Sequence, residues 1–423
     1  MKIINKKIIA TVAALGILTT AAEATPAFAR QMNAECMSCH YQNIPKLNSF
    51  GRDFKMSGFT MTGGVPEVTG NHLSIPATFN IAFVTKSRIV NSTGVLNKDT
   101  GIRDDTTKNV QIYDESAVLF GGKIGENMGA SFEMGGGDGL ALSGKMLFSK
   151  ELSFGRLGGG VFNTDALGAF AATEMFTTGL YRPVRQFENR GKTNIFQKAG
   201  IGAGATTGIT AFYYGNGLFV SAAQFLPAFA ASADMSKGFN TALRVAYTAS
   251  ISGWNVTLGG FSLSGDTTEA ADSGSVAESD RTASGVDLQI EGDVAGMSFM
   301  ATAGYVLENT YTTPATANVY TPDSTTTNAL TTPGSAKSKN DNGGFHVDAQ
   351  LNVLEHLGVK VAYLSYNDKL DDAEDYTTIS IGTNYSLYQN VDLVAEYSMT
   401  TMGTPAAGSK DPTDLLLMAE IAF

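Results

Sequence analysis

Apolar and polar residues alternate with a period of two through most of the chain beyond about residue 71. The clearest runs cover residues 286–291, 345–353, 391–397 and 414–423. Alternating runs of about ten residues, separated by turn residues, predict β-strands with one apolar and one polar face. A soluble β-sandwich alternates in the same way, so the period alone leaves open whether water or lipid covers the apolar face.

The connections between these runs favour lipid. Very short turns fall at Ala295–Gly296, Glu355–Leu357 and Tyr388–Asn390. Long polar stretches fall at residues 91–108, 265–282 and 309–342. Short turns at one end and long loops at the other are typical of an outer-membrane barrel, whose short turns face the periplasm. The last run ends in Phe423, which is similar to the C-terminal signal of bacterial outer-membrane barrels.

The sequence therefore predicts an all-β protein, a transmembrane antiparallel β-barrel over residues 71–423. At about 21 residues per strand and connection, this region holds about 16 strands. Ambiguous runs between Ala166 and Met235 allow about 14 to about 18 strands. Both termini would then lie in the periplasm, and the lumen would be wide enough for a short plug.

The N-terminus predicts export. Lysines precede the apolar run Ile8–Ala22, and a small-residue stretch ends at Ala29. This pattern is typical of a Sec signal peptide over residues 1–29, with Ala24 as a second acceptable cleavage site. A retained N-terminal anchor is the alternative, although the apolar run is short for a membrane span.

Composition narrows the partners. The formal net charge is -11 and only 16% of residues are charged. An acidic chain of this kind argues against nucleic acid as a partner. Beyond the signal peptide, no apolar stretch is long enough for a spanning helix, so outer-membrane lipid would contact strands.

Both cysteines of the chain lie in the motif Cys36-Met37-Ser38-Cys39-His40. This CxxCH pattern predicts one covalently attached haem c, because the two thiols can add to two vinyl groups while the imidazole ligates the iron. His40 would be the proximal ligand. A disulfide or an adventitious metal site is the alternative, but a redox CxxC is expected in a βαβ pattern that does not follow here.

The residues after the motif predict a small cytochrome-like plug over residues 30–70. Pro45 could begin a short helix in which Leu47, Phe50 and Phe54 share one face and cover the porphyrin. The segment is too short for a core of its own, so we expect the barrel to supply further walls.

Two features of the plug remain open from sequence. Arg52 and Lys55 could pair with the haem propionates or form a solvated basic face. Met56, Met61 and His72 are alternative distal ligands, each of which could equally be a packing or loop residue, and the sixth position could also be vacant or hold water.

Arg30, the CxxCH motif and the run Pro45-x-Leu47-Asn48-x-Phe50-Gly51-x-x-Phe54-x-x-x-Gly58-aromatic resemble the fused outer-membrane monohaem cytochrome-porins of iron-oxidising bacteria. The match covers about forty residues, and Phe59 stands where Tyr is often expected. Over the barrel the likeness lies in length, architecture and the terminal Phe.

The resemblance implies oxidation of extracellular Fe(II), or of another external electron donor, at the single haem. The electron would pass to a periplasmic c-type cytochrome, which is an Fe(II):cytochrome c oxidoreductase type of activity. Two alternatives stay open. One is an outer-membrane porin with a structural or regulatory haem plug, and the other is a conduit that reduces an extracellular acceptor.

Overall fold

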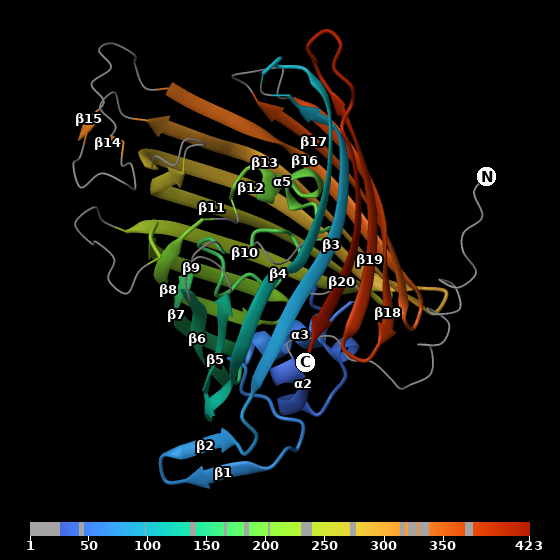
Figure 1. The fold of residues 1–423 in the computed structure, drawn as a ribbon. Helices are drawn as coiled ribbons and strands as arrows, with labels where there is room; N and C mark the ends of the chain where they lie inside the picture. The colour runs from blue at the N-terminus through green and yellow to red at the C-terminus, as the bar shows by residue number, and fades with distance from the viewer. Residues whose placement is uncertain are drawn as a thin grey trace, which may run out of the picture.

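The structure is a closed antiparallel β-barrel with helices inside its lumen (Figure 1). It is a computed structural model, which describes residues 26–41, 46–97, 99–135, 141–164, 167–181, 186–201, 204–229, 239–270, 276–313, 318–319, 328–329, 338–368 and 375–423. The predicted fold class is confirmed, and within these residues the barrel has 16 strands.

Each barrel strand pairs with its neighbours in sequence, and the last pairs with the first, as at Leu417 and Ile89. The barrel strands are β3 (Ile81–Leu96), β4 (Arg103–Gly125), β5 (Met128–Gly135), β6 (Ala141–Leu152), β7 (Gly155–Thr164), β8 (Thr206–Gly215), β9 (Leu218–Leu226), β10 (Asn240–Ile251), β11 (Trp254–Ala270), β12 (Val276–Val294), β13 (Met297–Thr313), β16 (Ser338–Leu354), β17 (Leu357–Asp368), β18 (Tyr376–Tyr388), β19 (Val391–Met402) and β20 (Thr413–Ala422). A small pair, β14 (Asn318–Val319) and β15 (Asn328–Ala329), lies outside the barrel.

The alternation seen in the sequence is the alternation between the lumen and the outer surface. On β12, Asp287 is 3% exposed and faces inward, whereas Val286 is 40% exposed and faces outward. His346 and Asp348 on β16 face the lumen in the same way. An apolar outer belt around a closed barrel is what a bilayer requires, because every backbone group is paired and no strand edge meets lipid.

The predicted asymmetry of the connections is present, but the loop boundaries were wrong. The turn between β12 and β13 consists of Ala295 (φ 55°) and Gly296 (φ 83°), a positive-φ pair that suits a tight hairpin. At the other end, β11 and β12 extend through most of the stretch 265–282. β3 and β4 likewise extend into 91–108. In these stretches the strands continue beyond the bilayer, where both faces meet water. Their residues are therefore polar on both faces, and the sequence shows no alternation that would mark them as strands.

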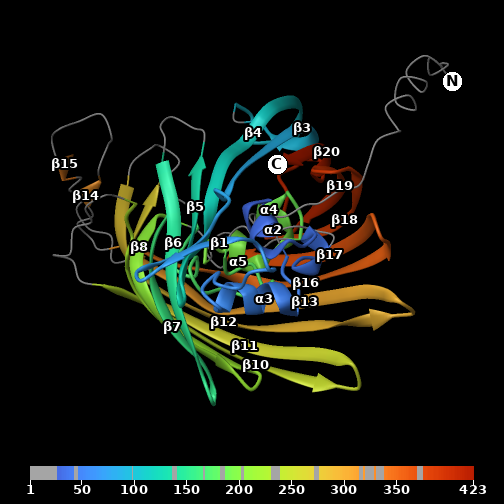
Figure 2. The same ribbon diagram turned by 90° about the horizontal axis from the view of Figure 1, so that it is seen from below.

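The N-terminal segment lies at the mouth that carries the short turns (Figures 1 and 2). It contains α2 (Pro26–Met32), the short 3₁₀ turn η1 (Cys36–Ser38), α3 (Ser49–Met56), β1 (Glu67–Gly70) and β2 (Leu73–Pro76). The C-terminus lies at the same mouth, where the Phe423 and Phe83 backbones exchange hydrogen bonds of 2.9 and 2.7 Å.

Helix α3 begins later than the sequence indicated. Its N-cap is Asn48, whose side chain accepts a hydrogen bond from the Gly51 amide, so the helix starts at Ser49. Pro45 lies outside the described residues, and Leu47 precedes the helix. The expected apolar stripe is also incomplete, because Phe54 is buried while Phe50 is 37% exposed.

A long connection between β7 and β8 folds into the lumen. It carries α4 (Arg190–Thr193), α5 (Ile195–Lys198) and buried aromatic residues, among them Phe170, Phe176 and Phe196. We call the described residues 167–181 and 186–201 the inward loop. Its apolar residues pack on lumen-facing side chains, as where the Phe196 and Phe261 rings meet at 5.0 Å. This loop explains the ambiguity of the sequence pattern over its own residues, whereas the strands β8 and β9 occupy most of the rest of the ambiguous range.

Among the described residues, no helix is long and apolar enough to cross a membrane. The predicted signal peptide falls almost wholly on residues 1–25, which lie outside the description. Its last residues belong to α2, which crosses the cleavage position predicted after Ala29.

Candidate functional site

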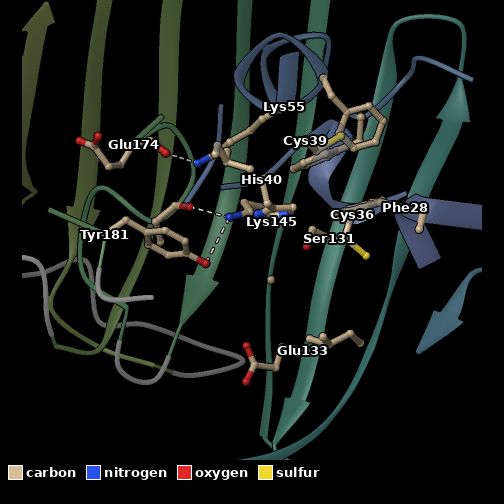
Figure 3. Close-up of a pocket in the computed structure, with 18 of the residues that line it drawn as sticks. Phe28, Cys36, Cys39, His40, Lys55, Ser131, Glu133, Lys145, Glu174 and Tyr181 are labelled. Carbon is tan, nitrogen blue, oxygen red and sulfur yellow. Dashed lines mark hydrogen bonds between the residues drawn. The ribbon is translucent and has the colours of Figure 1, made fainter. Parts of the chain in front are cut away.

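The CxxCH motif forms a tight helical turn. The amides of Cys39 and His40 both donate to the Cys36 carbonyl oxygen, at 3.0 and 2.9 Å. This turn brings the two cysteines and the histidine to one cavity (Figure 3). Cys36 and Cys39 form no disulfide with each other. Burial raises the pKa of the Cys39 thiol, so the thiol stays protonated at neutral pH.

Helix α3 is fastened directly onto this turn. The Asn48 amide donates to the Cys39 carbonyl at 2.9 Å, and the Asn48 side-chain amide donates to Ser38 at 3.0 Å. Gly51 allows the close approach, because a Cβ there would lie 2.2 Å from the Cys39 oxygen. The motif is therefore held rigidly against the helix that forms one cavity wall.

The cavity encloses about 260 Å³ between the plug, the barrel wall and the inward loop. The plug contributes Phe28, Leu47, Phe54 and Phe59, and the barrel contributes Leu119 among others. The barrel thus supplies walls that the short plug lacks, as the sequence led us to expect.

Aromatic rings form the apolar side of the cavity. The Phe28 ring stacks on Phe59 at 5.0 Å between centroids and meets the edge of Phe54 at 5.1 Å. Cleavage after Ala29 would remove Phe28 and enlarge the cavity on this side, whereas cleavage after Ala24 would keep it.

The opposite side of the cavity is polar and carries the lysines Lys55 and Lys145 together with Glu133 and Glu174 (Figure 3). Lys145 on β6 donates to the Ala171 carbonyl at 2.7 Å and to the Tyr181 hydroxyl at 3.4 Å. Lys55 at the end of α3 donates to the Glu174 carbonyl. The two ammonium groups lie 4.5 and 5.2 Å from the centre of the Tyr181 ring. Burial lowers the pKa of Lys55 and raises that of Glu174, since both groups lose water.

Arg52 follows neither alternative that the sequence left open, because its side chain is buried and does not line the cavity. Its guanidinium forms a two-point ion pair with Glu291 on β12, at 2.5 and 2.6 Å. Lys46 forms a second pair, 2.9 Å from Asp348 on β16, and both side chains are at most 1% exposed. These two pairs join the plug to the barrel wall, and removing one partner of a buried pair typically costs about 3–5 kcal/mol.

The structure separates the predicted distal ligands from the cavity. Met56 packs with Met175, Phe176 and Phe219 in another apolar cluster. The Met61 carbonyl accepts a hydrogen bond from Gln31, and His72 lies in the exposed turn between β1 and β2. Met32, which the sequence did not single out, does line the cavity. The only signal for Met32 in the sequence is its position four residues before Cys36.

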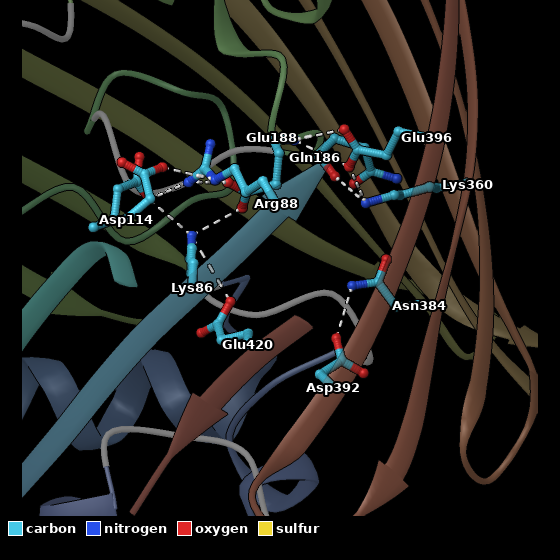
Figure 4. Close-up of polar contacts among 11 residues, drawn as sticks. Lys86, Arg88, Asp114, Gln186, Glu188, Lys360, Asn384, Asp392, Glu396 and Glu420 are labelled. Atoms are coloured by element: carbon cyan, nitrogen blue, oxygen red, sulfur yellow. Dashed lines mark hydrogen bonds and ion pairs between the residues drawn. The ribbon is translucent and has the colours of Figure 1, made fainter. Parts of the chain in front are cut away.

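Another polar network fastens the inward loop to the barrel (Figure 4). Glu188 in the loop pairs with Lys86 at 3.0 Å and with Arg88 at 3.2 Å, both on β3. Its amide donates to both carboxylate oxygens of Glu396, which in turn pairs with Lys360 at 2.7 Å. Such a charged network holds one loop conformation, because each charge has a fixed partner.

Comparisons with known proteins bear on the barrel. No family model and no curated protein matches the sequence. The anion-selective porin from Comamonas acidovorans is similar over 82% of this chain and 99% of its own, at 12% identity and a TM-score of 0.50. A loop-deletion mutant of OmpT, an outer membrane protein of Vibrio cholerae, covers 82% of this chain and 99% of its own at 11% identity and a TM-score of 0.49. The likeness to the porin shows the fold, which is a porin-like transmembrane barrel.

Proposed function

We propose that this protein is an outer-membrane electron conduit. It would oxidise extracellular Fe(II), or another external donor, at a single haem c attached through Cys36 and Cys39 with His40 as proximal ligand, and pass the electron to a periplasmic c-type cytochrome. The observation that carries the proposal is the cavity itself. Both thiols and the imidazole line one cavity with an apolar side and a polar side that carries two lysines, which fits a flat apolar cofactor with two carboxylates.

Each group in the cavity has a part in this function. A bound haem c would supply one-electron chemistry. Phe54 and Phe59 line the cavity with apolar surface whichever cleavage site is used, and this low polarity would tune the potential of a bound haem. The turn of η1 brings His40 and the two cysteines to the same cavity. The overall exchange is balanced, since each Fe(II) that becomes Fe(III) outside the cell reduces one ferric cytochrome inside.

The filled lumen favours electron passage over solute passage. Plug and inward loop pack as one body, with Met56 against Phe176 and Lys55 hydrogen-bonded to Glu174. The hydrocarbon layer is about 25 Å thick, which is more than one haem can span. The donor would therefore enter from the long-loop mouth, while the acceptor docks at the short-turn mouth. We place that mouth, with both termini, in the periplasm.

A porin with a structural or regulatory haem plug is the second candidate. The likeness of the barrel to that of an anion-selective porin supports it, since a barrel of this kind can pass solutes. The two differ in what crosses the membrane, which is an electron in one case and a solute in the other.

Vesicles that contain the purified protein can separate the two. One batch encloses an oxidised soluble c-type cytochrome, and a second encloses a coloured Fe(II)-specific chelator. On adding Fe(II) outside, the conduit predicts reduction of the trapped cytochrome with no colour in the chelator batch, and His40→Ala should stop the reduction. Rapid colour in the chelator batch, equal in wild type and His40→Ala, would favour the porin and contradict the conduit.

A further inference from the structure

We infer that Lys55 and Lys145, with the Tyr181 hydroxyl beside them, form the binding site for the two carboxylate groups of the haem. The inference rests on the haem attachment proposed above and assigns the polar end of that cavity. The site combines Lys55 of the plug with Lys145 of the barrel wall. A ligand bound to both lysines would therefore hold the plug to the barrel.

The charge balance inside the barrel carries the inference. Among the other buried cations, Lys46, Arg52 and Lys360 each contact a carboxylate at 2.5 to 2.9 Å, whereas Arg281 donates to the neutral oxygens of Ala199, Gly200 and Asn309. Among the described residues, Lys55 and Lys145 also donate to neutral oxygens, namely two backbone carbonyls and one phenol. Two ammonium groups buried side by side, with neutral oxygens as their hydrogen-bond acceptors, favour the binding of an anion beside them.

The position of the pair selects the kind of anion. Both lysines line the cavity that holds Cys36, Cys39 and His40, and both face the same Tyr181 ring (Figure 3). A flat ligand attached at the two cysteines would lie along the apolar walls, with its far edge toward Lys55 and Lys145. Glu133 and Glu174 line the same cavity, and the Glu174 carboxylate lies 3.5 Å from the Arg244 guanidinium. Two carboxylates on one edge of a flat ligand would match two cations on one side of the cavity.

The test is the haem potential of the purified full-length protein. An ammonium group beside the haem edge favours the reduced form, because that form carries one positive charge fewer. With Lys145→Gln, the ratio of reduced to oxidised haem at the wild-type midpoint should fall on the order of tenfold, which corresponds to about 59 mV for one electron. Lys55→Gln should shift the ratio in the same direction, and Lys145→Arg should keep it near the wild-type value.

Lys150→Gln is the matched control, since Lys150 lies on the same strand but is exposed. If Lys145→Gln does not assemble, the inference is tested by comparing the haem potential of Lys55→Gln with that of Lys145→Arg. Haem-loaded Lys145→Gln or Lys55→Gln with the ratio of Lys150→Gln would overturn this inference and leave the haem proposal standing. A wild-type protein without covalent haem would instead overturn the proposed function, which distinguishes the two failures.

Discussion

The ion pair between Arg52 and Glu291 should decide whether the plug stays in the barrel. Glu291→Gln removes the charge opposite a guanidinium that is held at 2.5 and 2.6 Å and whose side chain is 4% exposed. At an effective dielectric constant of about 20, two unit charges 4 Å apart attract by about 4 kcal/mol. This agrees with the cost of about 3–5 kcal/mol for breaking a buried pair from one side. At about 1.4 kcal/mol per tenfold, the undocked plug should become about two to four powers of ten more populated.

Limited trypsin digestion of the purified protein measures that population. The cleavage rate within the plug tracks the fraction undocked when opening is fast relative to cleavage. Glu151→Gln is the matched control, because its partner Arg156 lies in a half-exposed pair whose loss should cost at most about 1 kcal/mol. Arg52→Met combined with Glu291→Met should recover much of the resistance, since no lone charge remains buried. Equal plug cleavage in Glu291→Gln and Glu151→Gln would refute the reasoning.

Three further changes test other parts of the structure. Gly51→Ala should lower the haem-to-protein ratio several-fold, because the added Cβ would lie 2.2 Å from the Cys39 oxygen. The absorbance of the pyridine complex of the haem measures this ratio. Gly125→Ala is the control and should leave the ratio unchanged, because the space around Gly125 is open. Phe176→Ala should destabilise the inward loop by about 3–5 kcal/mol and raise ion conductance in planar bilayers, and unchanged conductance would argue against a loop that blocks the lumen. His40→Ala should abolish iron oxidation but leave a folded barrel with heat-dependent gel migration, and loss of the barrel would contradict the separation of site and strands.

The barrel could be predicted because the pattern that specifies each strand lies within a short stretch of sequence. Lipid on one side and a polar lumen on the other force a period of two, which residues 286–291 show directly. The inward loop could not be predicted in this way. Phe176 and Phe196 face a lumen filled with protein, so their apolar character does not mark a lipid-facing strand.

The candidate site likewise has one part that the sequence predicts and another that it does not. The CxxCH motif is local, and its spacing alone indicates the chemistry of Cys36, Cys39 and His40. The partners of Arg52 and Lys55 depend on contacts across more than a hundred residues, with Glu291 and Glu174. Sequence order carries no signal for such pairs, which is why the sequence left the partner of Arg52 open and did not bring Lys145 to the cavity.

The most direct test of the account is stopped-flow mixing of the purified, oxidised protein with Fe(II), followed by haem absorbance at a pH where abiotic oxidation is slow. An electron conduit for Fe(II) should show rapid reduction of the haem that saturates with Fe(II) concentration. An intact covalent haem that Fe(II) does not reduce would contradict the proposed conduit.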